Sequence, residues 1–408
     1  MAERILSGSE VVLQALVDQG VEVVFGYPGG AVLPLYDEIF KQNRIRHILV
    51  RHEQAAVHAA EGYARSTGKV GVVLVTSGPG ATNAVTGLTD ALMDSIPIVC
   101  LTGQVPTHLI GNDAFQEADT TGITRPCTKH NYLVKDSAKL ARTMHEAFHV
   151  ASSGRPGPVV IDLPKDILVA KAPYLEPSQV QHRTYNPVVK GDRGQIEEAL
   201  ELLASAKKPI LYCGGGVINS GSQACKVLTE FTRLTGIPIT LTLMGLGAYP
   251  ASDKQYLGML GMHGTYEANM AMHDCDVMIA VGARFDDRVT GNLDFFSPGS
   301  QKVQIDIDQS SINKNVPVDI GIVGDVGHVL EDMMKIWKAK QHKIEAKALD
   351  SWWDEIEGWR GKHCLSYKQP KDIIKPQHVI RRVHALTRDR KTYITTDVGQ
   401  HQMWAAQH

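Results

Sequence analysis

A single carboxylate, Glu53, stands where this sequence can support acid/base chemistry. It follows the apolar run 48–50 and precedes an alanine-rich segment, 54–65, whose apolar residues recur at helical spacing. We therefore expect Glu53 at a strand-to-helix junction, on the carboxyl edge of a parallel sheet, where ligands bind. A carboxylate there can act as a catalytic acid or base. The alternative is a first-turn acid that stabilises the helix N-terminus by about 0.3 to 1 kcal/mol.

Two glycine loops are predicted at the same edge. Strands expected at 21–25 and 70–76 lead into Pro28-Gly29-Gly30 and Ser77-Gly78-Pro79-Gly80, and Asn83 follows one helical turn later. Glycine lets a ligand approach the backbone closely, and proline stiffens a turn. Each loop alone is a common connector. The convergence of three strand ends is what favours a ligand site.

The elements around these loops predict an α/β fold with a doubly wound parallel sheet, because continuous apolar strands alternate with helices. Further strands are expected at 96–102 and 159–163, and helices at 8–19, 32–40, 81–93 and 137–152. The polar segment 104–125 is predicted to be a long loop on the ligand side, and loops of that length are often functional. Arg155 and Lys165 flank the strand 159–163 and are either site cations or solvated surface charges.

The domain organisation predicted from these patterns is a first domain over 1–165, a linker over 166–190 and a second α/β domain over 191–340. In the second domain the spacing from Gly214-Gly215-Gly216 to Gly221 does not match a dinucleotide-binding fingerprint. Asp306 and Asp308 follow a predicted strand and could accept ribose hydroxyls of an adenine nucleotide. Turn-forming aspartates are the alternative.

The C-terminal part is predicted to be a charged helical connector over 341–375, packed on another element through Trp352, Trp353 and Trp359, and then the beginning of a third α/β domain over 376–408. A helix at 377–387 and a strand at 392–396 precede a glycine turn at 398–401. One helix and one strand cannot bury a core. We expect this segment to be disordered or to depend on a partner.

Composition excludes several classes of protein. The 408 residues carry a formal net charge of −2, and 43% are hydrophobic, which favours neither a nucleic-acid partner nor an anionic membrane. There is no apolar run of membrane-spanning length and no signal-peptide core, so a cytoplasmic protein is expected. The six cysteines and 17 histidines show no metal-ligand spacing, and no metal site is expected within this chain.

Seven segments together resemble the large catalytic subunit of acetolactate synthase, also called acetohydroxyacid synthase, within the thiamine-diphosphate enzymes. The resemblance covers the entire chain. It is carried by VFGYPGGAVLPLYD, RHEQAAVHAAEGYAR, VTSGPGATN, GNDAFQEAD, SGRPGPVVIDLPKDI, GMLGMHGTYEANM and VGARFDDRVTGN.

This resemblance implies a reaction between 2-oxo acids in valine, leucine and isoleucine biosynthesis. Pyruvate would be decarboxylated on thiamine diphosphate, and the two-carbon unit would be transferred to pyruvate or 2-oxobutanoate. Glu53 would hydrogen-bond N1′ of the aminopyrimidine and promote the imino tautomer that removes the C2 proton. Gln116 would contact the cofactor or the reaction intermediates. The substrate channel would be lined by Phe115, Lys165, Gly30 and Met262, and Arg288 would bind the carboxylate of the second substrate.

The resemblance also assigns cofactor contacts. Those to thiamine diphosphate would be Pro28, Gly29, Glu53, Pro79, Asn83, Val398, Gly399, Gln400 and His401. Those to FAD, which has no net redox role in this family, would be Arg155, His263, Gly264, Gly282, Ala283, Arg284, Asp306 and Asp325, within the stretches 263–284 and 306–325.

One departure from the family pattern concerns the metal. Family members bind the diphosphate through a divalent cation, magnesium, held by a G-D-G motif and a later Asn pair, and only the partial echoes Gly191-Asp192-Arg193 and Gly324-Asp325-Val326 occur here. The family forms homodimers or dimers of dimers with active sites between subunits, commonly with a small regulatory subunit. The 408-residue chain alone is therefore expected to be inactive. An FAD-dependent pyruvate oxidase and a non-catalytic truncated partner of a full-length subunit are the alternatives.

Overall fold

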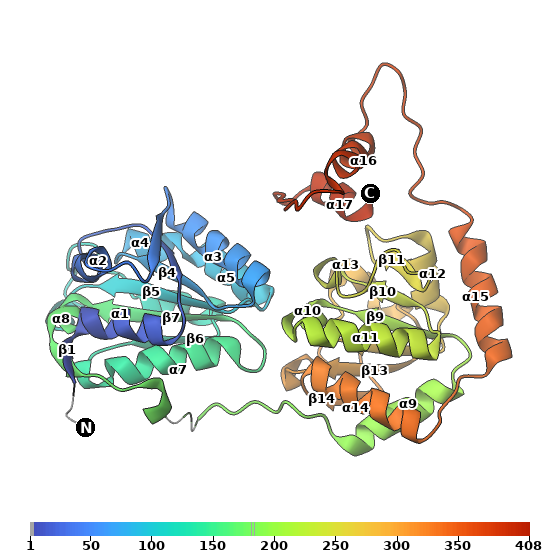
Figure 1. Ribbon diagram of the computed structural model, residues 1–408, viewed down its shortest axis with the longest axis horizontal. Coiled ribbons are helices and arrows are strands. Elements are labelled where there is room, and N and C mark those ends of the chain that lie inside the picture. Colours follow the sequence, from blue (N-terminus) through green and yellow to red (C-terminus); the bar gives the residue numbers. More distant parts are fainter. Residues whose placement is uncertain (1–3, 181, 183) are drawn as a thin grey trace. The chain divides into compact units, whose positions relative to one another are not determined.

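The computed structural model describes residues 4–180, 182 and 184–408. The chain divides into two compact units, Met1–Pro187 and Val188–His408 (Figure 1). Each unit is built on its own six-stranded parallel sheet. The predicted α/β, doubly wound class is confirmed for both.

The sheet of the first unit has the order β3-β2-β4-β5-β7-β6, and every pair in it is parallel. Its direction of winding reverses between β2 and β4, which creates a crevice at their carboxyl ends. The strands are β2 (Val23–Gly26), β3 (Arg46–Leu49), β4 (Gly71–Val75), β5 (Ile98–Gln104), β6 (His130–Leu133) and β7 (Pro158–Pro164).

Helices cover both faces of this sheet (Figure 1). One core joins the sheet to α1 and α7, and a second core joins it to α3 and α5. Local signals define the ends: Ser7 and Glu10 form a capping box at α1, and α3 ends at Gly68 with φ 72°. The helices are α1 (Gly8–Asp18), α2 (Leu33–Phe40), α3 (Glu53–Thr67), α4 (Pro79–Asn83), α5 (Val85–Met93), α6 (Thr120–Thr124), α7 (Leu140–Ser152) and α8 (Lys165–Val169).

Three local predictions for the first unit are wrong. The helix expected over 81–93 is divided into α4 and α5, and β6 is an additional strand whose partly polar edge sequence gave no apolar run. The linker expected over 166–190 is also wrong in its first part. Residues there form α8 and β8 (Lys171–Pro173), and β8 pairs antiparallel with β1 (Ile5–Ser7). Three-residue strands are too short to produce a periodic signal.

The second unit repeats the architecture, with the parallel order β11-β10-β9-β12-β13-β14 and a reversal between β9 and β12. Its strands are β9 (Pro209–Cys213), β10 (Ile239–Leu241), β11 (Tyr256–Met259), β12 (Val277–Val281), β13 (Gln301–Asp306) and β14 (Ile320–Val323). Its helices are α9 (Arg193–Ser205), α10 (Gly215–Asn219), α11 (Ser222–Thr235), α12 (Tyr266–Asp274), α13 (Asp287–Thr290), α14 (Val326–Ala339) and α15 (Ala346–Arg360).

The segment 341–375 is more than a connector. Trp352 in α15 is 0% exposed, belongs to a core cluster of the second unit and donates through Nε1 to the carbonyl oxygen of Pro209 at 3.1 Å. Further on, the chain forms α16 (Pro376–Thr387) and α17 (Gln400–Gln407). The predicted strand over 392–396 is absent, because no neighbouring strand offers these described residues its backbone groups.

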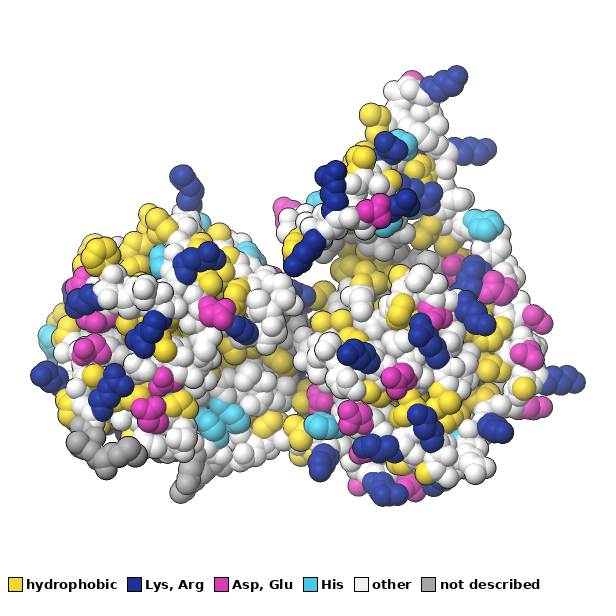
Figure 2. Space-filling model, in the orientation of Figure 1, with side chains coloured by type: hydrophobic (Ala, Val, Ile, Leu, Met, Phe, Trp, Pro, Cys, Tyr) yellow, Lys and Arg dark blue, Asp and Glu magenta, His cyan; other side chains and the backbone are white. Residues whose placement is uncertain are grey.

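The surface carries charges of both signs. On the face shown in Figure 2, basic and acidic side chains are interspersed over each unit, without a large area of one sign. Among the described residues, no helix is both long and apolar enough to span a membrane.

Candidate active site

The crevice of the first unit is built by close contact between two loops. Gly29 follows β2, and a Cβ atom placed on it would lie 2.5 Å from Cβ of Thr76, at the end of β4. A Cβ atom on Gly80 would lie 2.8 Å from Cγ2 of the same threonine. Any larger residue at either position would push the loops apart. Glycine is therefore required by packing as well as by access to the backbone.

Glu53 is the first residue of α3 and is only 8% exposed. The helix starts there because the ring Nδ1 of His52 accepts a hydrogen bond from the backbone N–H of Gln54 at 3.2 Å. The Glu53 carboxylate lies against the loop after β4: its Oε2 accepts from Nδ2 of Asn83 at 2.9 Å. A Cβ atom on Gly80 would be 3.6 Å from its Oε1. The three predicted strand ends thus meet around this carboxylate.

Gln116 belongs to the same crevice through its backbone. Gly78 has φ 53°, and a Cβ atom on it would lie 2.5 Å from the carbonyl oxygen of Gln116. Gln116 itself has φ 57°, in the left-handed region that only some residues tolerate. The neighbouring Phe115 side chain is 87% exposed. The segment 104–125 therefore brings Gln116 to the loop after β4. This agrees with the prediction that the segment lies on the ligand side of the sheet.

Lys165 lies at the carboxyl end of β7, as the first residue of α8, and is exposed. The next residue, Asp166, accepts a hydrogen bond from the backbone N–H of Thr107 at 3.0 Å, which ties α8 to the start of the segment 104–125. Partial burial acts to raise the pKa of Asp166, but hydrogen bonds from the Thr107 hydroxyl and from the backbone N–H groups of Thr107, Asp166 and Ile167 together lower it below its ordinary value.

The sequence analysis missed three polar residues near the crevice: Thr76, Gln104 and Asp162. Asp162 is 1% exposed and accepts from Oγ1 of Thr102 at 2.7 Å and from Nε2 of Gln104 at 2.9 Å. Burial raises the pKa of Asp162 to about 7, and the two hydrogen bonds partly oppose this. An acid inside the apolar strand 159–163 was the available signal.

The polar groups that line this crevice suit a thiamine ring. Oγ1 of Thr76 is buried and has no hydrogen-bond partner among the described residues. An orphaned hydroxyl beside two glycines and a buried carboxylate suits a flat ligand with ring nitrogens, because such a ligand could contact the backbone and use the unpaired group. The residues present therefore fit the predicted cofactor. Pro28 and Pro79, both exposed, flank these glycines.

In the second unit, Met262 and Arg288 are brought together. The backbone N–H of Met262 donates to the carbonyl oxygen of Arg288 at 2.8 Å, and Nη1 of Arg288 is 4.0 Å from the Met262 sulfur. The guanidinium also lies 3.3 Å from a carboxylate oxygen of Asp287, and both side chains are exposed. An exposed pair of this kind is worth about 0 to 1 kcal/mol. The guanidinium can therefore exchange this neighbour for a ligand carboxylate at little cost.

The predicted flavin residues fall into two groups. Gly282 follows β12 at the reversal of the sheet, where its carbonyl oxygen accepts from the N–H of Gly216 at 3.1 Å; Ala283 and Arg284 come next. Asp306 ends the neighbouring strand β13. Asp325 lies after the edge strand β14 instead and caps α14, where its Oδ1 accepts from Gly327 N–H at 3.0 Å and from Ser220 Oγ at 2.9 Å. The strand ends of β12 and β13 thus gather Gly282, Ala283, Arg284 and Asp306, but not Asp325.

The remaining predicted residues lie elsewhere. Arg155 is in the first unit, where its Nε donates to Oγ of Ser95 at 2.9 Å, just after α5. His263 accepts through its carbonyl oxygen from Nε2 of Gln407 at 2.8 Å, and Gly264 follows it. Val398 is 85% exposed and precedes α17, which begins after Gly399 with Gln400 and His401.

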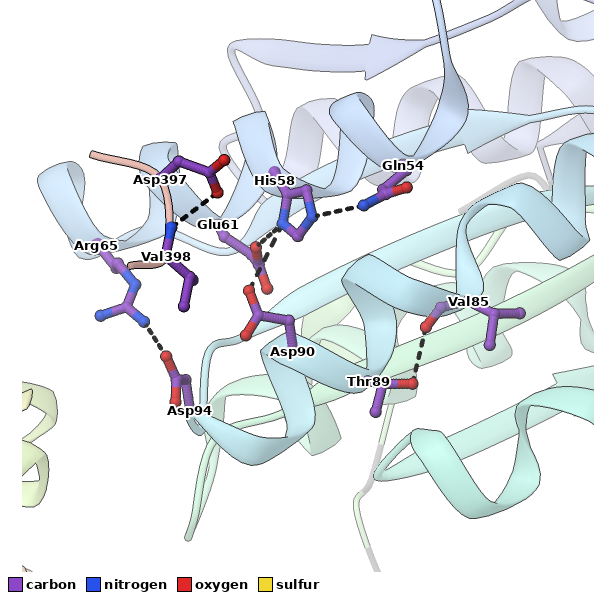
Figure 3. A network of polar contacts seen from close by, with 10 residues as sticks. All are labelled: Gln54, His58, Glu61, Arg65, Val85, Thr89, Asp90, Asp94, Asp397 and Val398. Atoms are coloured by element: carbon purple, nitrogen blue, oxygen red, sulfur yellow. Dashed lines mark hydrogen bonds and ion pairs between the residues drawn. The ribbon is translucent and has the colours of Figure 1, made fainter. Parts of the chain in front are cut away.

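A separate polar cluster lies on α3 and α5, away from the glycine loops (Figure 3). Nδ1 of His58 is 2.7 Å from Oε2 of Glu61 and 3.6 Å from Oδ2 of Asp90. Burial raises the pKa of Glu61 to about 7, while the His58 hydrogen bond acts against that rise. One turn further on, Arg65 pairs with Asp94 at 2.5 Å. His58 and Asp90 are exposed, and we assign this cluster no catalytic role.

Comparison with known proteins places this geometry in a family. Residues 6–123 match the model "Thiamine pyrophosphate enzyme, N-terminal TPP binding domain", and residues 196–333 match "Thiamine pyrophosphate enzyme, central domain". The chain is 54% identical to the acetolactate synthase large subunit of Haemophilus influenzae over 99% of its own length and 70% of that protein. It is also 54% identical to the acetolactate synthase isozyme 3 large subunit of Escherichia coli, over 98% of this chain and 70% of that protein. The Mycobacterium tuberculosis large subunit is 48% identical, over 98% and 65%. The chain belongs to the family of acetolactate synthase large subunits.

Proposed function

We propose that this chain forms the cofactor-activating part of an acetolactate synthase that joins two 2-oxo acids, with Glu53 as the acid/base residue. The observation that carries the proposal is the buried Glu53 carboxylate, held by Asn83 at the crevice where the sheet reverses. Pyruvate would be the donor, and pyruvate or 2-oxobutanoate the acceptor. The relatives' names favour this reading over a pyruvate oxidase or a non-catalytic partner.

Each residue of the crevice has a task that follows from its surroundings. The Glu53 carboxylate can share a proton with a ring nitrogen, because burial excludes water that would compete for it. The Asn83 amide fixes the carboxylate by occupying Oε2, so that Oε1 is the oxygen available to a ligand. Thr76 can pair its hydroxyl with the same ring. Thiamine diphosphate, when bound, supplies the nucleophilic carbon that attacks the 2-oxo acid.

Substrate-binding residues are proposed in each unit separately. In the first unit, Gln116 would contact the reacting groups, while Phe115, Lys165 and Gly30 would line the approach. In the second unit, Arg288 would bind the acceptor carboxylate through its planar fork, with Met262 beside it.

The other cofactors and partners complete the proposal. FAD would bind at the reversal of the second sheet, near Gly282, Ala283, Arg284 and Asp306, with Arg155, His263, Gly264 and Asp325 as further contacts. Magnesium would help to hold the diphosphate, and the contacts of thiamine diphosphate would include Pro28, Gly29, Pro79, Asn83, Val398, Gly399, Gln400 and His401. We further propose a homodimer or dimer of dimers with a small regulatory subunit, acting in branched-chain amino-acid biosynthesis.

The decisive experiment is the substitution Glu53→Gln in the holoenzyme with thiamine diphosphate, Mg²⁺ and FAD. We expect acetolactate formation from pyruvate to fall at least ~100-fold, with FAD content unchanged, because the amide cannot exchange a proton as a carboxyl can. Glu61→Gln is the matched control, since it removes the other buried carboxylate of α3, two turns further along the helix. Full activity of Glu53→Gln would contradict the proposal. Acetate formation coupled to an electron acceptor would indicate an oxidase instead.

A further inference from the structure

The part of the segment that carries Phe115 and Gln116, residues 105–118, is closed at its base by one side chain. Gln104, the last residue of β5, is 3% exposed. Its Nε2 donates to the carbonyl oxygen of Ala118 at 2.8 Å and to Oδ2 of Asp162 at 2.9 Å. Its Oε1 accepts from the backbone N–H of Val105 at 2.8 Å. The amide therefore joins the start of the segment, its end and the neighbouring strand β7.

The backbone groups around Gln104 decide which way its amide faces. The carbonyl oxygen of Ala118 can only accept, and the N–H of Val105 can only donate. The NH₂ group of Gln104, and not its oxygen, must therefore point toward Ala118, and Asp162 accepts from the same group. If the amide were reversed, its oxygen would face the Ala118 carbonyl oxygen and its NH₂ group would face the Val105 N–H, and these buried groups would lack partners.

The end of the segment transmits this constraint to Gln116, which precedes Ala118 by two residues. Glu117, between them, accepts hydrogen bonds from the backbone N–H groups of Gly111 at 2.5 Å and Ala114 at 3.0 Å. These hydrogen bonds join residues 111–117 into one compact turn, so that a displacement of Ala118 would displace Gln116 as well. On its other side, the carbonyl oxygen of Gln116 lies against Gly78.

We propose that Gln104 is a positioning residue for the reaction: its hydrogen bond to Ala118 holds Gln116 against the loop after β4, and the second hydrogen bond from the same NH₂ group, to Asp162, ties the amide to β7. This inference rests on the role proposed above for Gln116. In this proposal Gln104 acts through the segment and not by contact with substrate or cofactor, because its amide is already engaged by Ala118, Asp162 and Val105. The ring-bearing side of the crevice, with Glu53 and Asn83, does not depend on it.

Three variants of the holoenzyme separate positioning from simple stability. In Gln104→Glu the side chain keeps its shape, loses both donors and faces Asp162 with like charge. In Asp162→Asn the new amide can rotate, so that its oxygen accepts from Gln104 and its NH₂ donates to Thr102. In the double variant, the amide introduced at position 162 can donate to the carboxylate introduced at position 104. That bond removes the like-charge contact, but the donor to Ala118 is still missing.

The expected results differ between stability and turnover. We expect Gln104→Glu to lower the melting temperature and to lower kcat for acetolactate at least ~10-fold, with FAD content unchanged. Asp162→Asn should stay within about threefold of the wild-type kcat. The double variant should regain the melting temperature while kcat stays low. Recovery of kcat together with stability would overturn the proposal, as would full activity of Gln104→Glu.

Hydrogen–deuterium exchange over residues 105–118 gives a readout that does not need turnover. Exchange should be faster in Gln104→Glu and in the double variant, and unchanged in Asp162→Asn. Unchanged exchange in Gln104→Glu would overturn the positioning role. If the wild-type chain forms no acetolactate even when assembled with its partner subunits, the proposed function fails, and exchange still decides whether Gln104 holds the segment. Should Gln104→Glu not fold, the uncharged Gln104→Met, of similar length, takes its place in both measurements.

Discussion

The side-chain amide of Asn83 donates a 2.9 Å hydrogen bond to Oε2 of Glu53, across 30 residues of sequence. Asn83 is the last residue of α4 and Glu53 is the first residue of α3. The bond therefore joins the two helices that leave β3 and β4 at the crevice. It leaves one carboxylate oxygen, Oε1, facing the glycine loop. The orientation of the acid/base group thus depends on a neutral amide.

Removing that amide should slow the reaction without unfolding the protein. For Asn83→Leu we expect kcat to fall about 10- to 100-fold, because a hydrogen bond to a charged group is worth about 1.5 to 3 kcal/mol. Steady-state acetolactate formation measures the effect. Thr82→Ala is the control, since Thr82 is exposed on the same short helix and its hydroxyl bonds only the local carbonyl of Pro79. Equal losses in both variants would argue against the orienting role.

A methyl group at Gly78 should disturb the crevice from the backbone side. Gly78→Ala places a side chain at φ 53° and 2.5 Å from the carbonyl oxygen of Gln116, so both stability and kcat should fall. Gly62→Ala is the matched control. Gly62 lies within α3, and a Cβ atom added to it would meet no described neighbouring residue within 4 Å. Its replacement by alanine should therefore stabilise the helix by about 0.5 to 1 kcal/mol. Melting temperatures and kcat of both variants test the contrast.

The buried Asp162 carboxyl should make stability depend on pH. Its pKa is raised from an ordinary 3.8 to about 7, first by burial and further by the nearby Asp119 carboxylate, against hydrogen bonds from Thr102 and Gln104. The folded state therefore holds the proton more tightly than the unfolded state. This contribution to stability is complete below about pH 4 and is lost as the pH rises to about 7.

The variant Asp162→Asn isolates that contribution, because it cannot titrate. Between about pH 5 and pH 8 the wild type should lose stability relative to the variant, by about 1.4 kcal/mol for each unit of pKa difference that this interval spans. Melting temperatures of both proteins at the two pH values provide the comparison. Parallel changes in the two proteins would show that Asp162 does not titrate in this range.

Helix α15 should be necessary for the stability of the second unit. Trp352→Ala removes a fully buried indole and its hydrogen bond to Pro209, and we expect a loss of about 3 to 5 kcal/mol. Asp350→Ala, an exposed change on the same helix, should alter stability by less than about 0.5 kcal/mol. Thermal unfolding distinguishes them. A small effect of Trp352→Ala would mean that the packing of α15 contributes little to the stability of the second unit.

The sequence predicted what depends on local pattern. Apolar strands such as Val277–Val281 and glycine loops such as Ser77–Gly80 have strong signals, and their order alone indicates the sheet class. The charged segment 341–375 was predicted as a packed helical connector, and α15 confirms the helix; its partner, the core of the second unit, could not be predicted because Trp352 and Ile356 are buried among many exposed neighbours. The strand 392–396 was misread because its β-branched residues favour a strand, but pairing is a tertiary property.

The sequence predicts a site residue only where a reactive or polar side chain directly follows a predicted strand. Glu53 and Asn83 lie on a predictable edge, and the structure brings them into contact. Gln104 and Asp162 could not be found in this way, because their significance lies in a pairing between β5 and β7 that spans 58 residues. The assigned roles of the flavin and substrate residues came from family resemblance and remain predictions.

The pairing of β1 with β8 has a consequence for synthesis of the chain. Ile5 is aligned with Pro173, and the backbone N–H of Tyr174 donates to the carbonyl oxygen of Arg4 at 2.8 Å. During synthesis, β1 leaves the ribosome first and cannot pair until β8, about 170 residues later in the chain, has also been made. The first unit can form its sheet earlier, but it cannot close until that partner has emerged. Until then, the N-terminal strand is an open edge that a chaperone or another nascent chain could bind.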